Sequence, residues 1–144
     1  MQSDLIYNEE LLEGREAIVT GGATGLGRAI AVGLAQVGAQ VTIVSRQEDV
    51  LSAAAKQISN ETGKKVSYDI ADIRDIESVA QLADRHQNVD ILVNNAGGQF
   101  PQKARDLSPN GWRSVIDLNL NGTWNMTQAF GNNRLEGGGG SYAK

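Results

Sequence analysis

The sequence contains no cysteine and one histidine, His86, among its 144 residues. The absence of cysteine excludes disulfides, a thiolate nucleophile and zinc held by cysteine, and one histidine provides no pair of imidazole ligands. We therefore expect no metal site. Proline is also scarce, with 2 residues, and the chain combines 40% hydrophobic with 21% charged residues. This balance is typical of one globular domain and argues against a collagen-like or disordered chain.

Positive charge is in deficit, because 13 Lys and Arg face 17 Asp and Glu and the net charge is −4. Neutralising the phosphates of nucleic acid or of an anionic membrane requires surplus basic residues, so neither is expected as a partner. Residues 1–15 form a polar N-terminal extension without the features of a signal peptide, and no apolar run reaches the roughly 18 residues of a membrane span. We therefore expect a cytoplasmic protein whose partner is a small molecule.

Short β-branched runs alternate with segments of helical periodicity through most of the chain. The runs at 16–20, 40–45, 65–70 and 89–93 predict four strands. Apolar residues at helical spacing follow each run and predict four helices, with Asp75 and Ser108 as N-caps of the last two. The residues expected on the apolar faces of these two helices are Ile76, Val79, Ala80, Ala83, Trp112, Val115, Ile116, Met126 and Phe130.

Strands that alternate with helices of this length form a parallel sheet covered on both faces, since right-handed crossovers return each helix to the sheet. The expected fold class is therefore α/β: a Rossmann-type doubly wound parallel sheet within residues 16–130, truncated after about four βα units. Residues 131–144 contain four consecutive glycines and no periodicity. We expect them to be a Gly-rich tail without fixed structure, because the backbone entropy of glycine opposes order.

Three glycines follow the first expected strand. Gly21, Gly25 and Gly27 lie between this strand and the next helix, where a doubly wound sheet binds the pyrophosphate of a dinucleotide. Gly21 allows a sharp turn, Gly25 a close approach of the backbone to phosphate, and Gly27 close packing of the helix on the strand. Thr24 adds a hydroxyl donor. An ordinary tight turn would explain the glycines alone, so the flanking strand and helix carry the inference.

The second expected strand ends in Ser45 and Arg46. A site for NAD places an Asp or Glu here to accept a hydrogen bond from the ribose 2′-OH, and this sequence has none. A guanidinium beside a hydroxyl suits the 2′-phosphate of NADP instead, because arginine offers a planar fork of donors. NADP(H) is therefore favoured over NAD(H). The alternative is a solvated arginine that opens the second helix.

Four motifs, taken together, resemble those of the short-chain dehydrogenase/reductase family in order and spacing. They are TGGATGLG at 20–27, Asp72 with Ile73 after the third strand, NNAG at 94–97 and DLNLNG at 117–122. Within the family, GGQF at 97–100 with Gly111 and Trp112 is most similar to trans-2-enoyl-CoA and 2,4-dienoyl-CoA reductases and their bacterial relatives. The resemblance implies strand order 3-2-1-4.

The resemblance also implies a role for each matching position. The turn at 21–27 would face the pyrophosphate, Arg46 the adenosine ribose phosphate, and Asp72 and Ile73 the adenine. The implied cofactor-binding residues are Gly21, Thr24, Gly25, Leu26, Gly27, Ser45, Arg46, Asp72, Ile73, Asn94, Ala96 and Gly97, and the implied catalytic residue is Asn119, which would hold a proton-relay water. Plain structural roles stay open: a turn at Asp72, loop hydrogen bonds at Asn94, and a helix bend at Asn119.

The resemblance covers residues 12 to about 140, which correspond to the cofactor-binding half of a usual member. In the family, a run like GGGGS continues into a fifth strand, a catalytic Ser, and a Tyr and Lys four positions apart. Tyr142 and Lys144 are two apart and would point roughly 200° from each other on a helix, so they do not form this pair. We therefore expect a truncated chain, inactive on its own, whose fourth strand is a hydrophobic, unpaired edge that lowers solubility or causes self-association.

The function implied by the resemblance is that of an NADP(H)-dependent oxidoreductase that reduces a carbonyl or an enoyl thioester by hydride transfer, without the usual Ser/Tyr/Lys segment. Family members assemble through their fourth and fifth helices, which implies a homo-oligomer. Two other readings stay open: a noncatalytic dinucleotide-binding module, and a nonfunctional fragment that does not fold alone. A ligand that binds the folded state raises the unfolding midpoint, so NADPH separates the binding module from the fragment.

Overall fold

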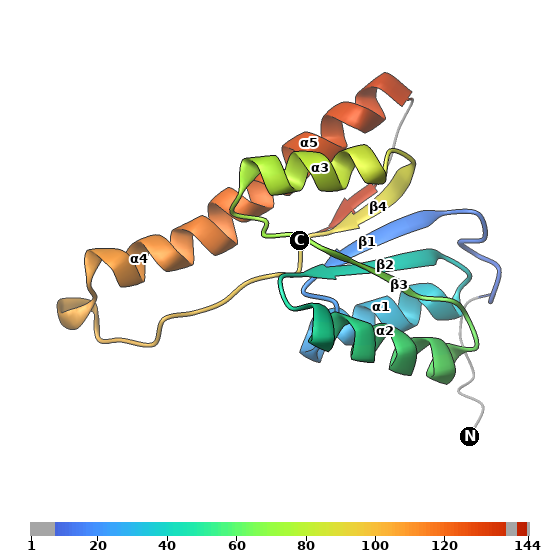
Figure 1. The fold of residues 1–144 in the computed structure, drawn as a ribbon, viewed down its shortest axis with the longest axis horizontal. Coiled ribbons are helices and arrows are strands. Elements are labelled where there is room, and N and C mark those ends of the chain that lie inside the picture. The colour runs from blue at the N-terminus through green and yellow to red at the C-terminus, as the bar shows by residue number, and fades with distance from the viewer. Residues whose placement is uncertain (1–7, 138–140, 144) are drawn as a thin grey trace.

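The computed structural model describes residues 8–137 and 141–143 as one parallel sheet flanked by helices (Figure 1). The sheet has five strands in the order β3-β2-β1-β4-β5, and every neighbouring pair is parallel. The strands are β1 Glu16–Thr20, β2 Gln40–Ser45, β3 Ser67–Ile70, β4 Val89–Val93 and β5 Ser141–Ala143. The order of the first four strands confirms the topology expected from the sequence.

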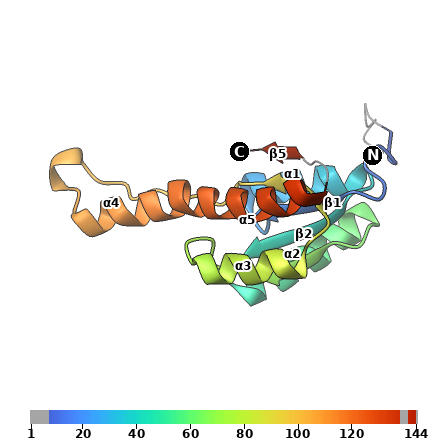
Figure 2. The ribbon, with the colours of Figure 1, turned by 90° about the horizontal axis from the view of Figure 1, so that it is seen from above.

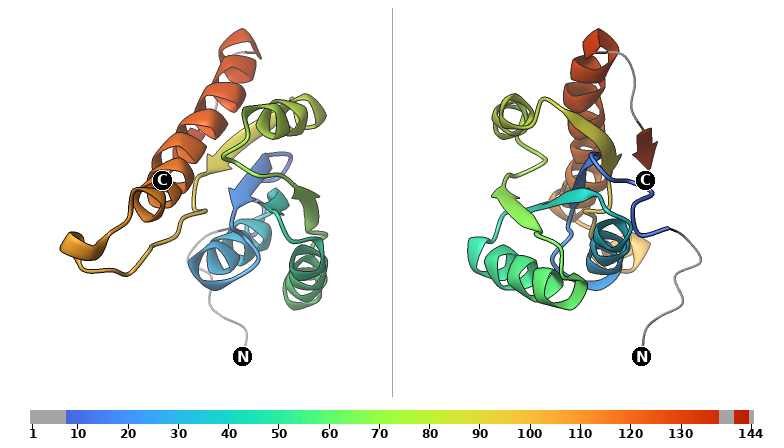
Figure 3. Two further views of the ribbon diagram at one scale, coloured as in Figure 1. Left: turned by 60° about the vertical axis from the view of Figure 1, so that its left-hand side comes forward. Right: turned by 90° about the vertical axis from the view of Figure 1, so that its right-hand side faces the viewer.

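Helices cover both faces of the sheet. Figure 1 shows α1 and α2 on one side and α3 and α5 on the other, and Figure 3 shows the same layers from two further directions. The helices are α1 Gly25–Gln36, α2 Glu48–Thr62, α3 Ile76–Arg85, α4 Pro109–Ile116 and α5 Gly122–Gly137, with a 3-10 turn at Ala104–Asp106 and a π-helical turn at Asp117–Asn121. This arrangement is the predicted doubly wound α/β fold.

The core lies in two layers, one on each face of the sheet. Successive residues of a strand point to opposite faces, so Ala17 and Val19 of β1 pack toward α1 and α2, whereas Ile18 packs toward α3 and α5. All three are almost completely buried. Burial on both faces explains why the strands read as continuous apolar runs rather than as an alternating pattern.

The predicted starts of α3 and α4 are confirmed by their caps. The carboxylate of Asp75 accepts hydrogen bonds from the backbone N–H groups of Glu77 (2.9 Å) and Ser78 (3.4 Å). The hydroxyl of Ser108 accepts from the N–H of Gly111 at 3.0 Å, and Pro109 occupies the first turn. Each cap satisfies N–H groups that the helix itself leaves without partners.

The prediction of a tail without fixed structure at 131–144 is partly wrong. Helix α5 continues to Gly137, and Ser141–Ala143 form β5, while 138–140 and 144 lie outside the described residues. Tertiary contacts override the weak local propensity: Phe130 is buried against the sheet, and the Asn133 side-chain amide donates to the carbonyl of Ala83 in α3 at 3.4 Å.

The expectation of an unpaired edge at β4 is also wrong where β5 lies. Ile91, Leu92 and Val93 pair in parallel with Ser141–Ala143. The backbone N–H and C=O groups of this part of β4 therefore face a neighbouring strand on both sides, since β1 pairs with the opposite edge. The expected self-association was argued from an unpaired edge at β4, and this part of β4 is paired.

Three residues expected on apolar helix faces are exposed instead. They are Ile76, at 72% exposure, Ala80, and Trp112 at 57%. In α3 the core contact is made by Leu82, which is fully buried beside Val79 and Ala83. Figures 1 and 2 show that α4 projects beyond the sheet, so Trp112 has no core to enter. Periodicity identified the helices, but the position of the sheet decides which turns are covered.

None of the helices within the described ranges has the length and apolar character that crossing a bilayer requires.

Two substitutions in α3 test this assignment of the core. Leu82→Ala is expected to lower the free energy of unfolding by about 2–5 kcal/mol, because it leaves a cavity in a closed layer. Ile76→Ala, a change of similar size on the same helix, is expected to alter it by less than about 0.5 kcal/mol. Urea titration followed by circular dichroism measures both. Equal losses from the two substitutions would contradict the assignment.

Candidate functional site

A pocket of about 400 Å³ opens at the carboxyl ends of the central strands. The order β2-β1-β4 reverses direction at β1, and ligands of open α/β sheets bind at such a switch point. The wall is built from the turn after β1, the end of β2, the segment after β3, the loop after β4 and the π-helical turn. The lining residues are Gly21, Thr24, Gly25, Leu26, Gly27, Val44, Ser45, Arg46, Ala71, Asp72, Ile73, Asn95, Ala96, Gly97 and Leu118.

The structure brings together all of the sequence-predicted cofactor-binding residues except Asn94. They come from four segments between residues 21 and 97, and each segment follows a different strand. Asn119, the predicted catalytic residue, lies beside the pocket and is not part of its lining. The sequence prediction of one shared site is therefore supported geometrically, with two exceptions that have structural explanations.

The first turn of α1 is open toward an anion. Its N-cap, Thr24, makes no side-chain hydrogen bond to the helix within the described structure, and no acidic residue occupies the first turn. Three other helices differ: α3 and α4 are capped by Asp75 and Ser108, and α2 begins with two acidic residues. An uncapped positive helix end with free N–H groups favours a bound phosphate.

Glycine is favoured at two positions of this turn for different physical reasons. A Cβ on Gly27 would collide with the carbonyl of Gly21 and the side-chain amide of Asn95, so only glycine allows this close packing. Gly25 has φ of +53°, and its Cβ position has no atom within 4 Å. Its side-chain position therefore faces open space, which leaves room for a ligand to approach the backbone.

The turn after β1 and the loop after β4 are joined by Thr20 and Asn95, which the sequence interpretation missed as site residues. The buried hydroxyl of Thr20 donates to the carbonyl of Val93 (3.3 Å) and accepts from the N–H groups of Asn95 (3.1 Å) and Ala96 (3.0 Å). The Asn95 side chain donates to the carbonyls of Thr20 (3.0 Å) and Gly21 (3.3 Å). The sequence did offer one signal for Thr20: it is a polar residue at the end of a largely apolar strand.

Asn94 points away from the pocket. It is buried, and its side-chain N–H donates to the hydroxyl of Thr127 in α5 at 3.1 Å. Its Oδ1 accepts no hydrogen bond from the part of the chain that the structure describes. Successive residues at the end of a strand alternate in direction, so Asn94 attaches α5 while Asn95 faces the turn after β1. Its contribution to the site is the placement of the loop that follows β4.

Asn119 occupies the π-helical turn between α4 and α5. Its side-chain N–H groups donate to the carbonyls of Gly98 (2.7 Å) and Val115 (2.8 Å), and its Oδ1 accepts from the N–H of Gly98 (3.2 Å). A Cβ at Gly97 would lie 2.7 Å from this Oδ1. The geometry supports the helix-bending alternative: the widened turn lets Asn119 fix the loop that lines the pocket. A water-relay role stays a prediction.

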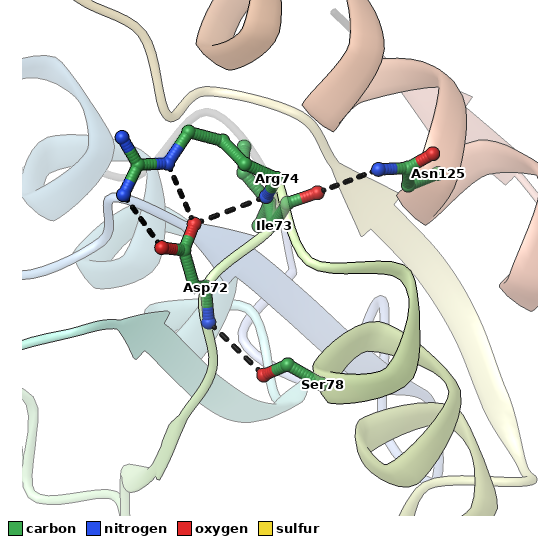
Figure 4. A network of polar contacts seen from close by, with 5 residues as sticks. All are labelled: Asp72, Ile73, Arg74, Ser78 and Asn125. Carbon is green, nitrogen blue, oxygen red and sulfur yellow. Dashed lines mark hydrogen bonds and ion pairs between the residues drawn. The ribbon is translucent and has the colours of Figure 1, made fainter.

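Asp72 is held by Arg74, which was not among the sequence-predicted site residues (Figure 4). Its carboxylate accepts from Arg74 Nε (2.9 Å) and Nη2 (2.6 Å) and from the Arg74 backbone N–H (3.0 Å). These side-chain hydrogen bonds lower the pKa of Asp72, with a smaller contribution from the charge of Arg46, and they raise the pKa of Arg74. Asp72 is therefore an ion-paired carboxylate at neutral pH.

Two further bonds fix the backbone of this segment, as Figure 4 shows. The N–H of Asp72 donates to the hydroxyl of Ser78 at 3.1 Å, and the Asn125 side chain donates to the carbonyl of Ile73 at 3.0 Å. The segment after β3 is thus anchored to α3 on one side and to α5 on the other. Its position at the pocket is set by the fold and not by a ligand.

A doubly wound parallel sheet with an open helix end and a glycine turn at its switch point defines a dinucleotide-binding domain. The family model described as short chain dehydrogenase matches residues 15–142. The chain therefore belongs to the short-chain dehydrogenase family, whose members are oxidoreductases that bind a nicotinamide dinucleotide and act on small molecules.

The curated relatives are longer than this chain. It is 39% identical over 131 residues to a Caenorhabditis elegans protein named as probable 2,4-dienoyl-CoA reductase 3 [(3E)-enoyl-CoA-producing], covering 88% of this chain and 42% of that protein. The chain spans between 40% and 51% of the length of eight curated relatives.

Solved structures agree closely with the fold. The citronellol catabolism dehydrogenase of Pseudomonas aeruginosa PAO1 aligns with a TM-score of 0.89 at 34% identity, over 97% of this chain and 59% of the other. A Beutenbergia cavernae protein named as an NAD(P) dependent gluconate 5-dehydrogenase, with NADP bound at low occupancy, aligns with a TM-score of 0.85 at 36% identity, over 94% and 55%. These matches confirm the Rossmann-type fold predicted from the sequence.

Thr20→Val tests the link between the two pocket loops. The substitution keeps the shape of the side chain and removes the acceptor of the Ala96 N–H, so we expect the free energy of unfolding to fall by about 1–3 kcal/mol. Amide exchange at Ala96 should also become faster. Thr42→Val, on the neighbouring strand β2, is the control, because no side-chain hydrogen bond of Thr42 is found in the described structure. Equal effects of both substitutions would contradict the assigned role of Thr20.

Proposed function

We propose that this chain binds NADP(H) and forms the cofactor-binding part of an oxidoreductase that reduces a carbonyl or an enoyl thioester. The observation that carries this proposal is the pocket at the switch point, which combines the open end of α1 with Ser45 and Arg46. The residues fit a dinucleotide, because the missing side chain of Gly25 leaves open space beside free N–H groups. A cytoplasmic location and a homo-oligomer remain part of the proposal.

The turn residues Gly21–Gly27 would bind the pyrophosphate through backbone N–H groups at the positive end of α1. Ser45 and Arg46 would bind the adenosine ribose, and Asp72 with Ile73 would form the wall beside the adenine. Ala96 and Gly97 would contact the ribose on the other side of the switch point. When bound, a nicotinamide dinucleotide supplies the hydride that reduces a carbonyl or an activated alkene.

The preference for NADP(H) is proposed from the end of β2. An acidic residue that would accept from a ribose 2′-OH is missing there, and Arg46 forms no ion pair with any described residue. Its guanidinium is exposed at the pocket, and its N–H donors are available to bind phosphate oxygens. The NADP bound to the Beutenbergia cavernae relative is consistent with this choice.

A noncatalytic dinucleotide-binding role is the second candidate, and the pocket lining favours it for this chain alone. The titratable residues among the lining are Arg46 and Asp72, and Asp72 is paired with Arg74. Reduction of a carbonyl or an enoyl thioester requires a proton donor beside the nicotinamide. Binding without turnover is therefore the expected behaviour of the chain by itself, whereas hydride transfer is the proposed reaction of the oxidoreductase.

Nucleotide binding is tested with the full chain and an arginine variant. NADPH is expected to raise the unfolding midpoint, because it binds the folded state only. Arg46→Ala is expected to weaken NADPH binding by roughly 10- to 100-fold, through loss of charge-assisted hydrogen bonds, and to leave NADH binding unchanged. Titration calorimetry measures both dissociation constants.

Arg113→Ala, on α4 and outside the pocket lining, controls for the loss of a positive charge and should change neither constant. A chain whose unfolding midpoint is the same with and without millimolar NADPH or NADH would contradict the proposed function. Oxidation of NADPH by an enal or enoyl thioester in the presence of this chain would contradict the noncatalytic candidate.

A further inference from the structure

We infer that Arg74 determines the preference of the pocket for a 2′-phosphorylated nucleotide by neutralising the carboxylate of Asp72 and so keeping Arg46 available. The inference rests on the proposed function, because it concerns the adenosine end of the same site. Arg74 itself is absent from the pocket lining, whereas Asp72 and Arg46 both belong to it. Arg74 is therefore a positioning residue that acts through Asp72 and does not touch the ligand.

The pair between Asp72 and Arg74 occupies both carboxylate oxygens. Nε of Arg74 donates to Oδ1 at 2.9 Å and Nη2 donates to Oδ2 at 2.6 Å, a bidentate arrangement that fixes the plane of both groups (Figure 4). The Arg74 backbone N–H adds a third bond to Oδ1 at 3.0 Å. The side chain of Arg74 is 38% exposed and that of Asp72 is 30% exposed, so the pair is partly solvated and its strength depends on salt.

The backbone places this carboxylate beside Arg46. The N–H of Ala71 donates to the carbonyl of Ser45 at 3.0 Å, which joins the end of β3 to the end of β2. Asp72 and Arg46 are the residues that follow these two joined positions. Arg46 is near enough for its charge to contribute to the lowered pKa of Asp72.

An unpaired carboxylate at this position would oppose a 2′-phosphate in two ways. It would repel the dianionic phosphate directly, and it would attract the Arg46 guanidinium that the phosphate requires. Arg74 opposes both effects, because its guanidinium balances the charge of Asp72 and donates to both of its oxygens. In agreement with this, Arg46 has no ion-pair partner anywhere in residues 8–137. An uncharged ribose 2′-OH, as in NAD, is not repelled by a carboxylate and does not require the guanidinium of Arg46.

The test is a double-mutant cycle read with two probes that differ in the 2′-phosphate: adenosine 2′,5′-bisphosphate and adenosine 5′-monophosphate. Arg74→Ala is expected to weaken the bisphosphate by roughly three- to tenfold, as for a partly solvated charge, and the monophosphate by less than about twofold. In Asp72→Asn with Arg74→Ala, the bisphosphate affinity should return to that of Asp72→Asn alone, because the charge that Arg74 neutralises is gone. The loss in Arg74→Ala should shrink at high salt.

Arg85→Ala is the matched control. Arg85 makes a similar bidentate pair with Asp69, at 3.0 Å and 3.1 Å, outside the pocket lining. Its removal should leave both probe affinities unchanged. Unfolding midpoints and circular dichroism of every variant separate loss of affinity from loss of folding.

Two results overturn the inference while leaving the proposed function intact. If the double variant binds the bisphosphate as weakly as Arg74→Ala, Arg74 contacts the phosphate directly and does not act through Asp72. If Arg74→Ala weakens both probes equally, Arg74 has no role in the preference. Failure of the proposed function is a different result: the unsubstituted chain binds neither probe and neither dinucleotide.

Discussion

At the carboxyl ends of β1 and β4, partly buried backbone N–H groups need partners beyond the parallel ladder, and the rest of the site depends on how this need is met. The hydroxyl of Thr20 accepts from the N–H groups of Asn95 and Ala96, and the Asn95 side chain returns two bonds to the chain after β1. Leaving such groups unpaired where water has little access is costly. Joining the two loops therefore satisfies the backbone and simultaneously fixes both walls of the switch point.

Charge is distributed in the pocket so that positive groups stay available. The end of α1 keeps its free N–H groups because neither a side-chain cap nor an acidic first-turn residue is present in the described helix. The one carboxylate in the lining, Asp72, is bound by Arg74, while Arg46 stays unpaired among the described residues. A chain with a net charge of −4 thus presents an electropositive site, since local pairing and not net charge decides what a cleft attracts.

The sequence predicts those features that depend on near neighbours. The caps at Asp75 and Ser108 are local, because each side chain bonds to an N–H two or three residues later, and both are confirmed. Features that depend on distant contacts were missed. Ile76 and Trp112 continue helical patterns, yet only the sheet's position determines that they face water. Arg74 is an exception, because its partner Asp72 is only two residues away, and the pair was missed although it is local.

The same distinction explains the site residues. The glycine turn and the motif after β4 line one pocket, because the carboxyl ends of parallel strands meet at one edge of a sheet. Asn94 and Asn119 were assigned from resemblance, and their hydrogen bonds lead elsewhere, to Thr127 and to Gly98. Both asparagines position the long helix against the pocket. At the start of α5, a Cβ on Gly122 would lie 2.7 Å from the side chain of Ile73, and the Asn125 side chain donates to the Ile73 carbonyl. The start of α5 thus contacts the segment after β3, while the π-helical turn contacts the loop after β4 through Asn119. The π-helical turn and the start of α5 therefore hold two walls of the pocket together, which makes helix geometry, and not the glycine turn alone, a determinant of the shape of the site.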